Sequence, residues 1–600
     1  MNKNIFCRIL TVFLLILPVA ALFMCIHRYG VNVVFWDEWA VVDLYEDLVT
    51  NGFSFAKLFA QHNEHRMFFP NIIMLIASCL SGWNTKVEMY LSACMLSAIY
   101  YICAKIAIGK GIRDWTGKDA LFASLLGGCL ISACQWENLL MGFQLAWYLL
   151  VMSVILSLVF FSKYYEKNEI KYGIVSMVFA TIATYSSLQG VAIWFMYLAI
   201  SAILLISKQK MPEAATRIES IVISVRLIGK KMIPFGIVGT AEIMFYFWGY
   251  SRVENHGEYQ TTNIVQCLEF MMKQIGYIFN NTNERVALFL GILLTLLSIL
   301  LVSYLIHIKK AEQYIASIGM MIFGMGVILM ISIGRSNLAL ASRYTTFALM
   351  ILAGEFSIIY REINQKMSTV PVNIELCQIF AAVEGMMIAL CIVESLDSLQ
   401  ICGLTYTSRM EAREALQNYK DVPLDALQKV CYWQNYEETY KAAHILEQRN
   451  WNVWKDKHLL YEKADMNGIE ISYEPLNTYN VEAIIWDNEC KVISVGGWAV
   501  DHDSEQMYDH LLVKVNDIYY KSKDHLERKD VAEYFENEKF EHTGFSFSKS
   551  VDVLHEGVNT ISLLLITQDG KTAYASHDFY IYFSRETGLY CCDESGEAIG

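Results

Sequence analysis

The chain has 600 residues, 55% of them hydrophobic and 18% charged, and its mean hydropathy is +0.33. This composition excludes an ordinary soluble protein, and the long uncharged blocks predict a polytopic α-helical membrane protein. Charge is divided unevenly, because residues 401–600 hold 19 basic and 35 acidic side chains, whereas the residues before them hold 28 and 26. So acidic a tail argues against binding to nucleic acid or to anionic lipid, since both require basic surfaces.

A membrane-spanning helix needs about 20 mainly apolar residues, or somewhat fewer when it is packed among other helices. A shorter apolar block at 68–83 is expected to dip into the outer leaflet without crossing. The number of spans rises if block 68–83 crosses the membrane, or if block 87–107 is broken into two segments. We therefore expect about 11 to 13 spans. The eleven candidate spans are 9–27, 87–107, 119–134, 139–161, 172–187, 189–207, 232–248, 286–308, 315–333, 344–360 and 376–396.

The distribution of Lys and Arg predicts the orientation, because cytoplasmic loops carry these residues in excess. The basic connections are 108–118, 162–171, 208–231, 309–314 and 361–366. If these face the cytoplasm, the alternate connections lie outside a multi-pass cell-membrane protein: 28–67, 135–138, the turn near 188, 249–285, 334–343 and everything after 396.

The sequence pattern of the tail changes twice. Residues 408–450 carry helical periodicity with charged faces, and from about 480 short alternating runs are separated by Gly, Asn and Asp, which is typical of an antiparallel β-sandwich. The runs are VEAIIW, KVISVGGWAV, HLLVKVNDIYY, TGFSFSKSVDV, NTISLLLITQDG and DFYIYF. We therefore expect a multi-span membrane domain (1–400), an extracytoplasmic helical linker (401–475) and an extracytoplasmic all-β sandwich (476–600).

The first outside loop, 28–67, begins with an acidic pair. Asp37 and Glu38 lie in VVFWDEWAVVDLYEDL, beside the end of the first apolar block. Ionisable groups held against a membrane are costly, so they favour a site that handles a proton, a metal or charge. The alternative is a solvated segment in which Trp36 and Trp39 anchor the chain at the interface.

The same loop ends in QHNEHRMFFP, which holds His62, Glu64, His65 and Arg66. A carboxylate in this loop is suited to take a proton from an acceptor hydroxyl, while His and Arg bind an anionic leaving group. His62, Glu64 and His65 are also metal-ligand types, although H-x-x-H lacks the i, i+4 spacing of zinc proteases. No C-x-x-C pair or Cys/His cluster with metal-ligand spacing is found in the sequence.

A second polar group lies at the mouth of a span. Gln135, Glu137, Asn138 and Gln144 belong to QWENLLMGFQLAWYL, and polar side chains in such a place need partners or a ligand. The alternative is that they only form hydrogen bonds with neighbouring helices.

Connection 249–285 offers Tyr250 and His256. Its later part, IVQCLEFMMKQIGYIF, has the pattern of an amphipathic helix lying on the membrane, and either part could line a groove for a lipid substrate. A lone loop histidine is more often only solvated.

Two arginines flank the last outside connection before the tail. Arg335 and Arg343 belong to SIGRSNLALASRYTTF, and Tyr344 follows directly. Arginine binds phosphate oxygens in a bidentate fork, so two arginines on one membrane face suit a pyrophosphate or phosphodiester. The alternative is that both side chains snorkel to lipid headgroups.

Together these residues resemble the GT-C superfamily of integral-membrane glycosyltransferases, which use polyprenyl-phosphate-linked sugars. Such enzymes carry an acidic pair in the first outside loop, and Asp37 and Glu38 match it. The segments H-N-E-H-R, W-E-N with G-F-Q, W-G-Y and G-R…S-R-Y are similar to those of bacterial GT-C-like proteins. The likeness spans roughly residues 1–400, and the tail resembles carbohydrate-binding β-sandwich modules.

The resemblance implies a hexosyl- or pentosyltransferase of the cell envelope. It would move a sugar from a polyprenyl-phosphate donor to a glycan, teichoic acid, lipid or protein. Asp37 would be the base that activates the acceptor hydroxyl, and Glu38 would support it or a divalent cation such as Mg²⁺ or Mn²⁺, although some members work without metal. Arg335 and Arg343 would hold the donor phosphate, and His256 would assist the leaving group.

Two other kinds of function remain open. A transporter or flippase of a lipid-linked glycan would use buried charges to line a path and would need no base, but the internal repeats that favour transport are not visible in the sequence. A membrane scaffold whose sandwich domain binds glycan would need no chemistry at all.

Overall fold

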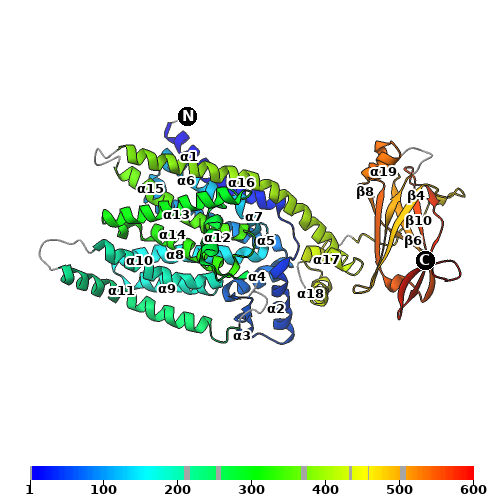
Figure 1. Cartoon of the computed structure of the whole chain (residues 1–600), viewed down its shortest axis with the longest axis horizontal. Coiled ribbons are helices and arrows are strands. Elements are labelled where there is room, and N and C mark those ends of the chain that lie inside the picture. Colours follow the sequence, from blue (N-terminus) through cyan, green and yellow to red (C-terminus); the bar gives the residue numbers. More distant parts are fainter. Residues whose placement is uncertain are drawn as a thin grey trace. The chain divides into compact units, whose positions relative to one another are not determined.

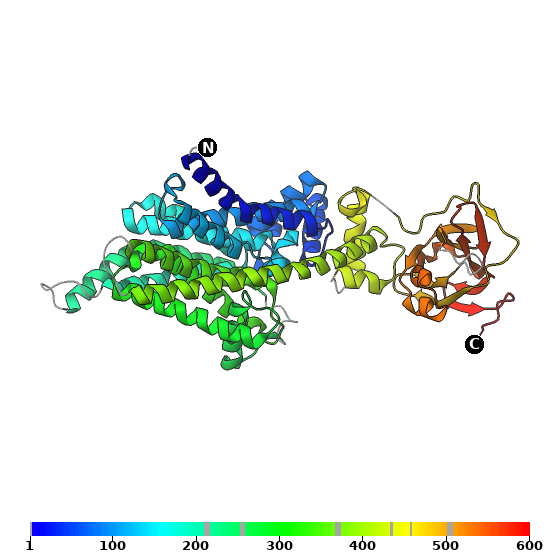
Figure 2. The same ribbon diagram turned by 90° about the horizontal axis from the view of Figure 1, so that it is seen from above.

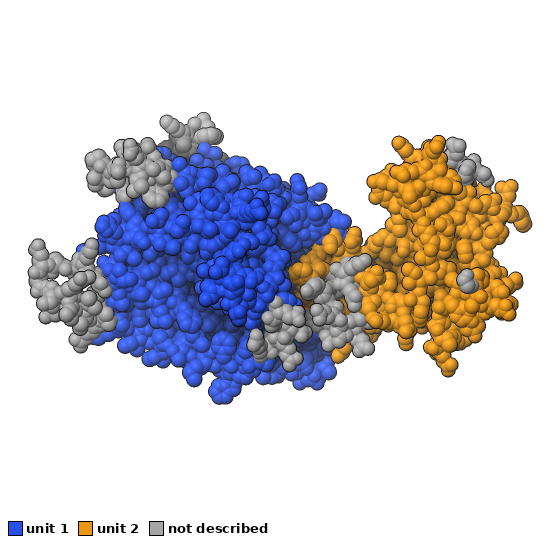
Figure 3. Space-filling model, in the orientation of Figure 1, with its two compact units in different colours: residues 1–32, 40–407 blue, residues 33–39, 408–600 orange. Residues whose placement is uncertain are grey.

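The computed structural model describes residues 3–208, 217–251, 259–366, 374–431, 436–456, 459–500 and 508–599. The chain divides into two compact units (Figure 3). Unit 1 contains Met1–Asn32 and Ala40–Thr407, and unit 2 contains Val33–Trp39 and Ser408–Gly600. The short segment around the acidic pair is therefore grouped with the tail, and each unit is described by itself.

Unit 1 is helical, and most of its long helices run roughly side by side (Figures 1 and 2). Its core is formed by apolar side chains of these helices. The helices are α1 (Lys3–Tyr29), α2 (Trp39–Thr50), α3 (Phe55–Leu58), α4 (Phe68–Ser81), α5 (Thr85–Ile108), α6 (Gly117–Leu130), α7 (Trp136–Leu139), α8 (Leu145–Lys167), α9 (Ile170–Thr184), α10 (Ala192–Lys208), α11 (Arg217–Tyr246), α12 (Ile264–Gly276), α13 (Glu284–His307), α14 (Ile315–Arg335), α15 (Thr345–Lys366) and α16 (Ile374–Gln417).

Eight helical segments among the described residues are long and apolar enough to cross a membrane, which supports the prediction of a helical membrane protein. They are Leu10–Tyr29, Thr85–Ile108, Gly117–Leu139, Gly142–Lys167, Leu188–Ser207, Glu284–His307, Ala311–Arg335 and Ala382–Gln417. The predicted spans 172–187, 232–248 and 344–360 also fall on helices, namely α9, α11 and α15.

Helix α4 occupies the block 68–83. Its 14 residues extend about 21 Å at the α-helical rise, which is shorter than the roughly 30 Å of a hydrocarbon core. The length of α4 is therefore compatible with the predicted segment that enters the membrane without crossing it.

The last helix of unit 1 differs from the prediction. We expected a span that ends at residue 396, but α16 continues without interruption to Gln417. The added residues contain no proline and include the strong helix formers of EAREALQ, so nothing in this stretch ends the helix.

Connections that are far apart in the sequence meet at the two ends of unit 1. At one end, the Tyr360 hydroxyl donates a hydrogen bond to Asp119 at 2.8 Å, and Lys310 lies 2.9 Å from Glu362, so three of the basic connections adjoin one another. The other end holds α2, α3, α4 and α7 (Figure 1). The predicted outside connections of unit 1 meet there.

In the part of unit 2 that the structure describes, the end of α16 is followed by three further α-helices and two β-sheets. In the larger sheet the central strand, β10, pairs with β6 along one edge and with β11 and β12 along the other, and the smaller sheet has the order β4-β5-β9-β8. The elements are α17 (Leu424–Cys431), α18 (Tyr436–Gln448), α19 (Lys529–Tyr534), β3 (Glu470–Ile471), β4 (Tyr479–Asp487), β5 (Val492–Ala499), β6 (His510–Val515), β7 (Ile518–Lys521), β8 (Lys523–Leu526), β9 (Gly544–Ser550), β10 (Gly557–Ile566), β11 (Thr572–Ala575), β12 (Phe579–Ser584) and β13 (Gly588–Cys592).

All six predicted alternating runs form strands, and aromatic contacts join the two sheets. Trp486 of β4 meets Phe583 of β12 with ring centroids 5.9 Å apart, and Tyr520 of β7 meets Phe547 of β9 at the same distance. The short strands β3, β8, β11 and β13 are additional to the prediction.

The predicted linker is helical, and it packs on the β-rich region. Asp421 accepts a hydrogen bond from Lys549 at 2.7 Å and another from the Ser550 backbone at 3.2 Å, while Asp487 accepts one from the Leu424 backbone at 2.8 Å. Residues after 408 therefore belong to the same compact unit as the sheets.

Helix α12 packs closely on α13 through two glycines. A Cβ on Gly276 would lie 1.8 Å from the Ala287 carbonyl oxygen, and one on Gly291 would lie 1.8 Å from the Met272 carbonyl oxygen. The other face of α12 exposes Ile264 and other apolar side chains, as expected for an amphipathic helix on a membrane. Any side chain at either glycine would push α12 away from α13.

We therefore expect Gly291→Ala to destabilise unit 1. Overpacking in a close contact typically costs about 1–3 kcal/mol, and here the obstacle is backbone, so the midpoint of thermal unfolding in detergent should fall. Gly326→Ala on α14 is the matched control, because nothing lies within 4 Å of the added methyl group and alanine favours the helix. Equal midpoints for the two variants would contradict the close contact.

Candidate functional site

The segment 61–66 folds as a small hairpin at one end of unit 1. Strand β1 (Gln61–His62) pairs with β2 (His65–Arg66), so that His62 lies directly opposite His65. Asn63 turns the chain with a φ of 49°, a left-handed conformation that asparagine tolerates better than most residues. Glu64 therefore lies at the tip, between the two histidines.

Arg66 fixes this hairpin to the end of α11. Its guanidinium donates hydrogen bonds to the backbone carbonyl oxygens of Phe59 at 2.9 Å, Tyr246 at 2.6 Å and Trp248 at 2.6 Å. The side chain is buried, and its charge lies 4.9 Å from the centroid of the Phe59 ring. Arg66 thus positions the hairpin, and its binding of an anion stays a prediction.

Glu64 reaches from the hairpin to the end of α14. Its Oε1 lies 3.5 Å from the guanidinium of Arg335, and the two side chains are 23% and 27% exposed. Tyr250 lies near this pair, and burial, together with the Glu64 carboxylate, raises the pKa of its hydroxyl. The predicted residues Glu64, Arg335 and Tyr250 are thus brought together.

A second ion pair joins α7 to the turn η8 (Ser342–Tyr344), which precedes α15. Glu137 Oε1 lies 3.6 Å from Arg343 Nη1, and Glu137 Oε2 accepts hydrogen bonds from the Ser342 hydroxyl and the Arg343 backbone, both at 2.9 Å. The carboxylate therefore binds both the side chain and the backbone of the segment that carries Arg343.

Neighbouring amides extend this network. Asn138 donates to the Arg343 carbonyl oxygen at 2.8 Å and to the Thr346 hydroxyl at 2.9 Å, and Gln135 accepts from the hydroxyls of Thr346 at 2.9 Å and Tyr148 at 3.1 Å. Both amides are fully buried. Gln135 and Asn138 therefore both form hydrogen bonds with neighbouring helices, while the Asn138 side-chain oxygen is buried without a hydrogen-bond partner.

The two ion pairs belong to one polar region, because other contacts join their segments. The His62 ring packs against Phe143 of η4 (Gly142–Gln144) at 5.6 Å, and His65 Nδ1 accepts a hydrogen bond from the Leu188 backbone at 3.3 Å. Gln144 is buried beside the sulfur of Met141. Tyr344 is buried under the guanidinium of Arg343, 5.3 Å from its ring centroid. We call the set of residues 61–66, 135–144 and 335–344 the polar end.

The acidic pair lies in unit 2. Asp37 and Glu38 form the turn η1 (Trp36–Glu38), in which Trp36 has a φ of 53° and Glu38 Oε2 accepts a hydrogen bond from the Phe35 backbone at 3.4 Å. Glu38 is buried, with 2% exposure, whereas Asp37 is half-buried. The guanidinium of Arg409, on α16, lies 3.0 Å from the centroid of the Phe35 ring and anchors the turn.

The different burial of the two carboxylates assigns them different tasks. A buried carboxylate that caps its own turn is suited to hold the backbone, and a half-exposed neighbour is the one that a substrate can reach. Of the pair, Asp37 is therefore the candidate for proton transfer, and Glu38 is its structural support.

The alternative in which His62, Glu64 and His65 bind a metal finds no support in the geometry of the hairpin. Among the residues that the structure describes, His62, Glu64 and His65 are not gathered into a group of ligand atoms that could share one ion, because His62 faces Phe143 and His65 faces the Leu188 backbone. His256 lies outside the described residues.

Four residues of these sites were not predicted from the sequence. Ser342 and Thr346 complete the network around Glu137, Gln274 exchanges two hydrogen bonds with the Ala341 backbone at 3.0 and 3.2 Å, and Arg409 anchors the acidic turn. The hydroxyls that flank Arg343 were visible in the motif S-R-Y-T-T, but Gln274 and Arg409 gave no local signal.

No protein-family model matches this sequence, and the comparison with curated proteins gives no match.

The role of Arg66 can be tested by its removal. Arg66→Ala removes the donor of three backbone carbonyl oxygens, one of them in a buried bond and two in part-buried bonds. Hydrogen bonds to charged groups are worth roughly 1.5–3 kcal/mol each, so we expect a loss of at least about 3 kcal/mol. The midpoint of thermal unfolding in detergent measures it. Arg285→Ala, at an exposed position on α13, should leave the midpoint unchanged. A stable Arg66→Ala protein would return Arg66 to the candidates for anion binding.

Proposed function

We propose that the protein is a membrane glycosyltransferase of the GT-C type, which transfers a sugar from a polyprenyl-phosphate donor to an acceptor of the cell envelope outside the cytoplasm. The observation that supports it most is the polar end, where two arginines, one at the end of α14 and one in the turn before α15, are each paired with a carboxylate at one end of an apolar helical body. A reaction on a lipid-linked anion needs positive charge at the end of the apolar helical body.

Arg335 and Arg343 are the proposed ligands of the donor phosphate. Their distances to Glu64 and Glu137, 3.5 and 3.6 Å, are longer than the 2.7–2.9 Å of strong charge-assisted hydrogen bonds. A guanidinium carries five N–H donors in a planar fork, so it can bind a phosphate while it remains beside its carboxylate. In the absence of donor, the two glutamates balance both positive charges.

Asp37 is the proposed general base. The acceptor oxygen attacks the anomeric carbon of the donor sugar, and its proton passes to the Asp37 carboxylate. The bond between the anomeric carbon and the phosphate oxygen breaks, and its electron pair leaves with the polyprenyl phosphate.

Several finer features belong to the same proposal. We propose that the two sheets of unit 2 form a β-sandwich that binds carbohydrate, that unit 2 lies outside the cytoplasm, and that the membrane part has about 11 spans. A divalent cation such as Mg²⁺ or Mn²⁺ would be held by Asp37 and Glu38 if the reaction uses one. The buried position of Glu38, which caps its own turn, favours transfer without a metal at that carboxylate.

The substitution Asp37→Asn tests the base. General bases contribute about 10²–10⁴-fold to the rate, so a strain with this variant should lack the same envelope glycan as a deletion strain, by mass spectrometry of envelope glycans. Asp43→Asn, an exposed position on α2, is the matched control and should restore the glycan. Both proteins must be present in membranes in equal amount. A normal glycan with Asp37→Asn would exclude the enzyme and favour transport or a scaffold.

The substitutions Arg335→Lys and Arg343→Lys test the donor site. Lysine keeps a positive charge beside the glutamate but loses the bidentate fork, so we expect at least about tenfold weaker binding of polyprenyl phosphate to purified protein, with normal expression. Neutral polyprenol should bind weakly to all variants. Arg285→Lys is the control. If polyprenyl phosphate binds the variants as it binds the unmodified protein, or if only expression is lost, the arginines serve the membrane interface.

A further inference from the structure

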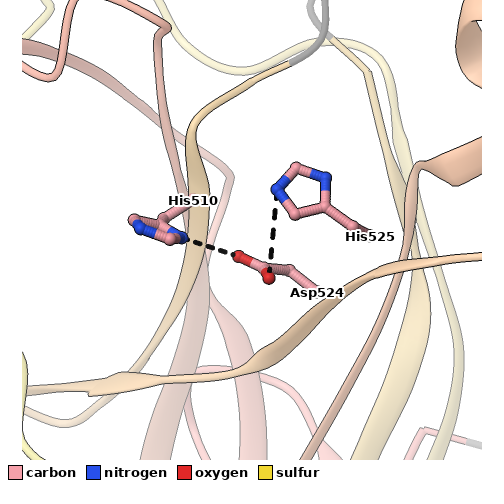
Figure 4. Close-up of side chains that lie close together, drawn as sticks. All are labelled: His510, Asp524 and His525. Carbon is pink, nitrogen blue, oxygen red and sulfur yellow. Dashed lines mark hydrogen bonds and ion pairs between the residues drawn. The ribbon is translucent and has the colours of Figure 1, made fainter. Parts of the chain in front are cut away.

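Three metal-ligand side chains meet in the β-rich part of unit 2, far in sequence from the motifs discussed above. His510 begins β6, which belongs to the larger sheet, and Asp524 and His525 are neighbours on β8, which belongs to the smaller sheet (Figure 4). Their potential ligand atoms all lie within 4.8 Å of one another, and among the described residues this is the one such group of three.

Asp524 is the centre of the group. Its Oδ2 lies 3.2 Å from His510 Nδ1, and its Oδ1 lies 4.0 Å from His525 Nε2. Ligands bound to zinc at about 2.0–2.2 Å in a tetrahedron lie roughly 3.3–3.6 Å apart, so these two distances bracket the spacing required.

The backbone of β8 is irregular at this point, and the irregularity turns both neighbours to one side. Successive side chains of a regular strand point to opposite faces. In such a strand the adjacent residues Asp524 and His525 could not bind the same ion. The register of β8 on β9 shifts between Lys523 and Leu526, and His525 has a φ of 56°. A left-handed residue within a strand turns its side chain away from the regular alternation, and here it turns His525 toward Asp524.

Neighbouring groups hold the ligands in place. Asp524 Oδ2 accepts a hydrogen bond from the Leu511 backbone at 3.0 Å, the His525 ring stacks on buried Tyr508 with 4.9 Å between centroids, and His525 Nε2 lies 2.9 Å from the Asp509 carbonyl oxygen. The backbone bond to Asp524 is a second-shell contact, which orients a metal ligand. With the ring proton on Nδ1, His525 Nε2 presents its lone pair to an ion, and the Asp509 carbonyl oxygen is close enough to serve as a further ligand. The His510 side chain is 62% exposed, which leaves a path for an ion from solvent.

We propose that His510, Asp524 and His525 bind a divalent transition-metal ion, with Zn²⁺ as the ion that best fits two imidazoles and one carboxylate. Water or the Asp509 carbonyl oxygen completes the coordination. Because His510 lies on one sheet and the other two ligands lie on the other, the ion links the two sheets and stabilises the β-rich region. This site is independent of the proposed transferase reaction.

The test uses the full chain, purified in detergent without a histidine tag and treated with a chelator. Equilibrium dialysis against ZnCl₂, with metal measured by mass spectrometry, should show one ion per chain that His510→Ala and His525→Ala each weaken at least tenfold. Exposed His577 lies outside the group, so His577→Ala is the matched control and should bind like the unmodified protein. Zinc should also raise the unfolding midpoint of the control but not that of the two variants.

Binding of Co²⁺ distinguishes the proposed site from a site formed by the cysteines of the chain. Co²⁺ at the proposed site should give the visible spectrum of a nitrogen and oxygen site without a thiolate charge-transfer band. His510→Ala changes an exposed side chain, so its failure to fold would be unexpected; a folded His510→Ala protein with unchanged zinc affinity would overturn the proposal. Absence of zinc binding by the unmodified chain, or a thiolate spectrum, would also overturn it.

Discussion

The polar end of unit 1 is governed by the cost of leaving charge unpaired in an apolar body. Glu137 is mostly buried, and a carboxylate in such a place is stable only when positive charge and hydrogen-bond donors reach it. Arg343 and the Ser342 hydroxyl supply both, and they also fix the first turn of α15 against α7. The position of Arg343 is thus a consequence of the requirements of Glu137.

The same reasoning explains why the hairpin can carry Glu64 so close to Arg335. Arg66 binds three backbone carbonyls of unit 1, so the hairpin is attached to the helices by a buried fork that no lysine could replace. One arginine therefore builds the region, and two others, each about one quarter exposed, remain at its surface beside a carboxylate. In the sequence the three arginines look alike. Their burial and their hydrogen bonds show which one holds the hairpin and which two stay at the surface.

Much of the fold could be predicted, because hydrophobic blocks and alternating runs follow directly from burial in helices and strands. Each predicted span lies mostly on a helix, and each of the six alternating runs forms a strand. The end of α16 was missed, since a charged amphipathic helix after a span looks like a separate element. The short strands β3, β8, β11 and β13 were missed because two to five residues are too few to show a period.

The candidate sites were harder to predict for a different reason, which lies in the backbone. Trp36, Asn63 and His525 all adopt a left-handed φ near 50°, and each lies beside the carboxylate of a candidate site: Asp37, Glu64 and Asp524. At such residues the direction of a side chain no longer follows from the helical or strand period, so the sequence gives the residue types but not their partners. Adjacent Asp524 and His525 would point apart in a regular strand, so the sequence does not indicate that they can bind one ion. Left-handed residues also occur away from any site, as at Trp83, so the conformation becomes informative only where it brings titratable groups together.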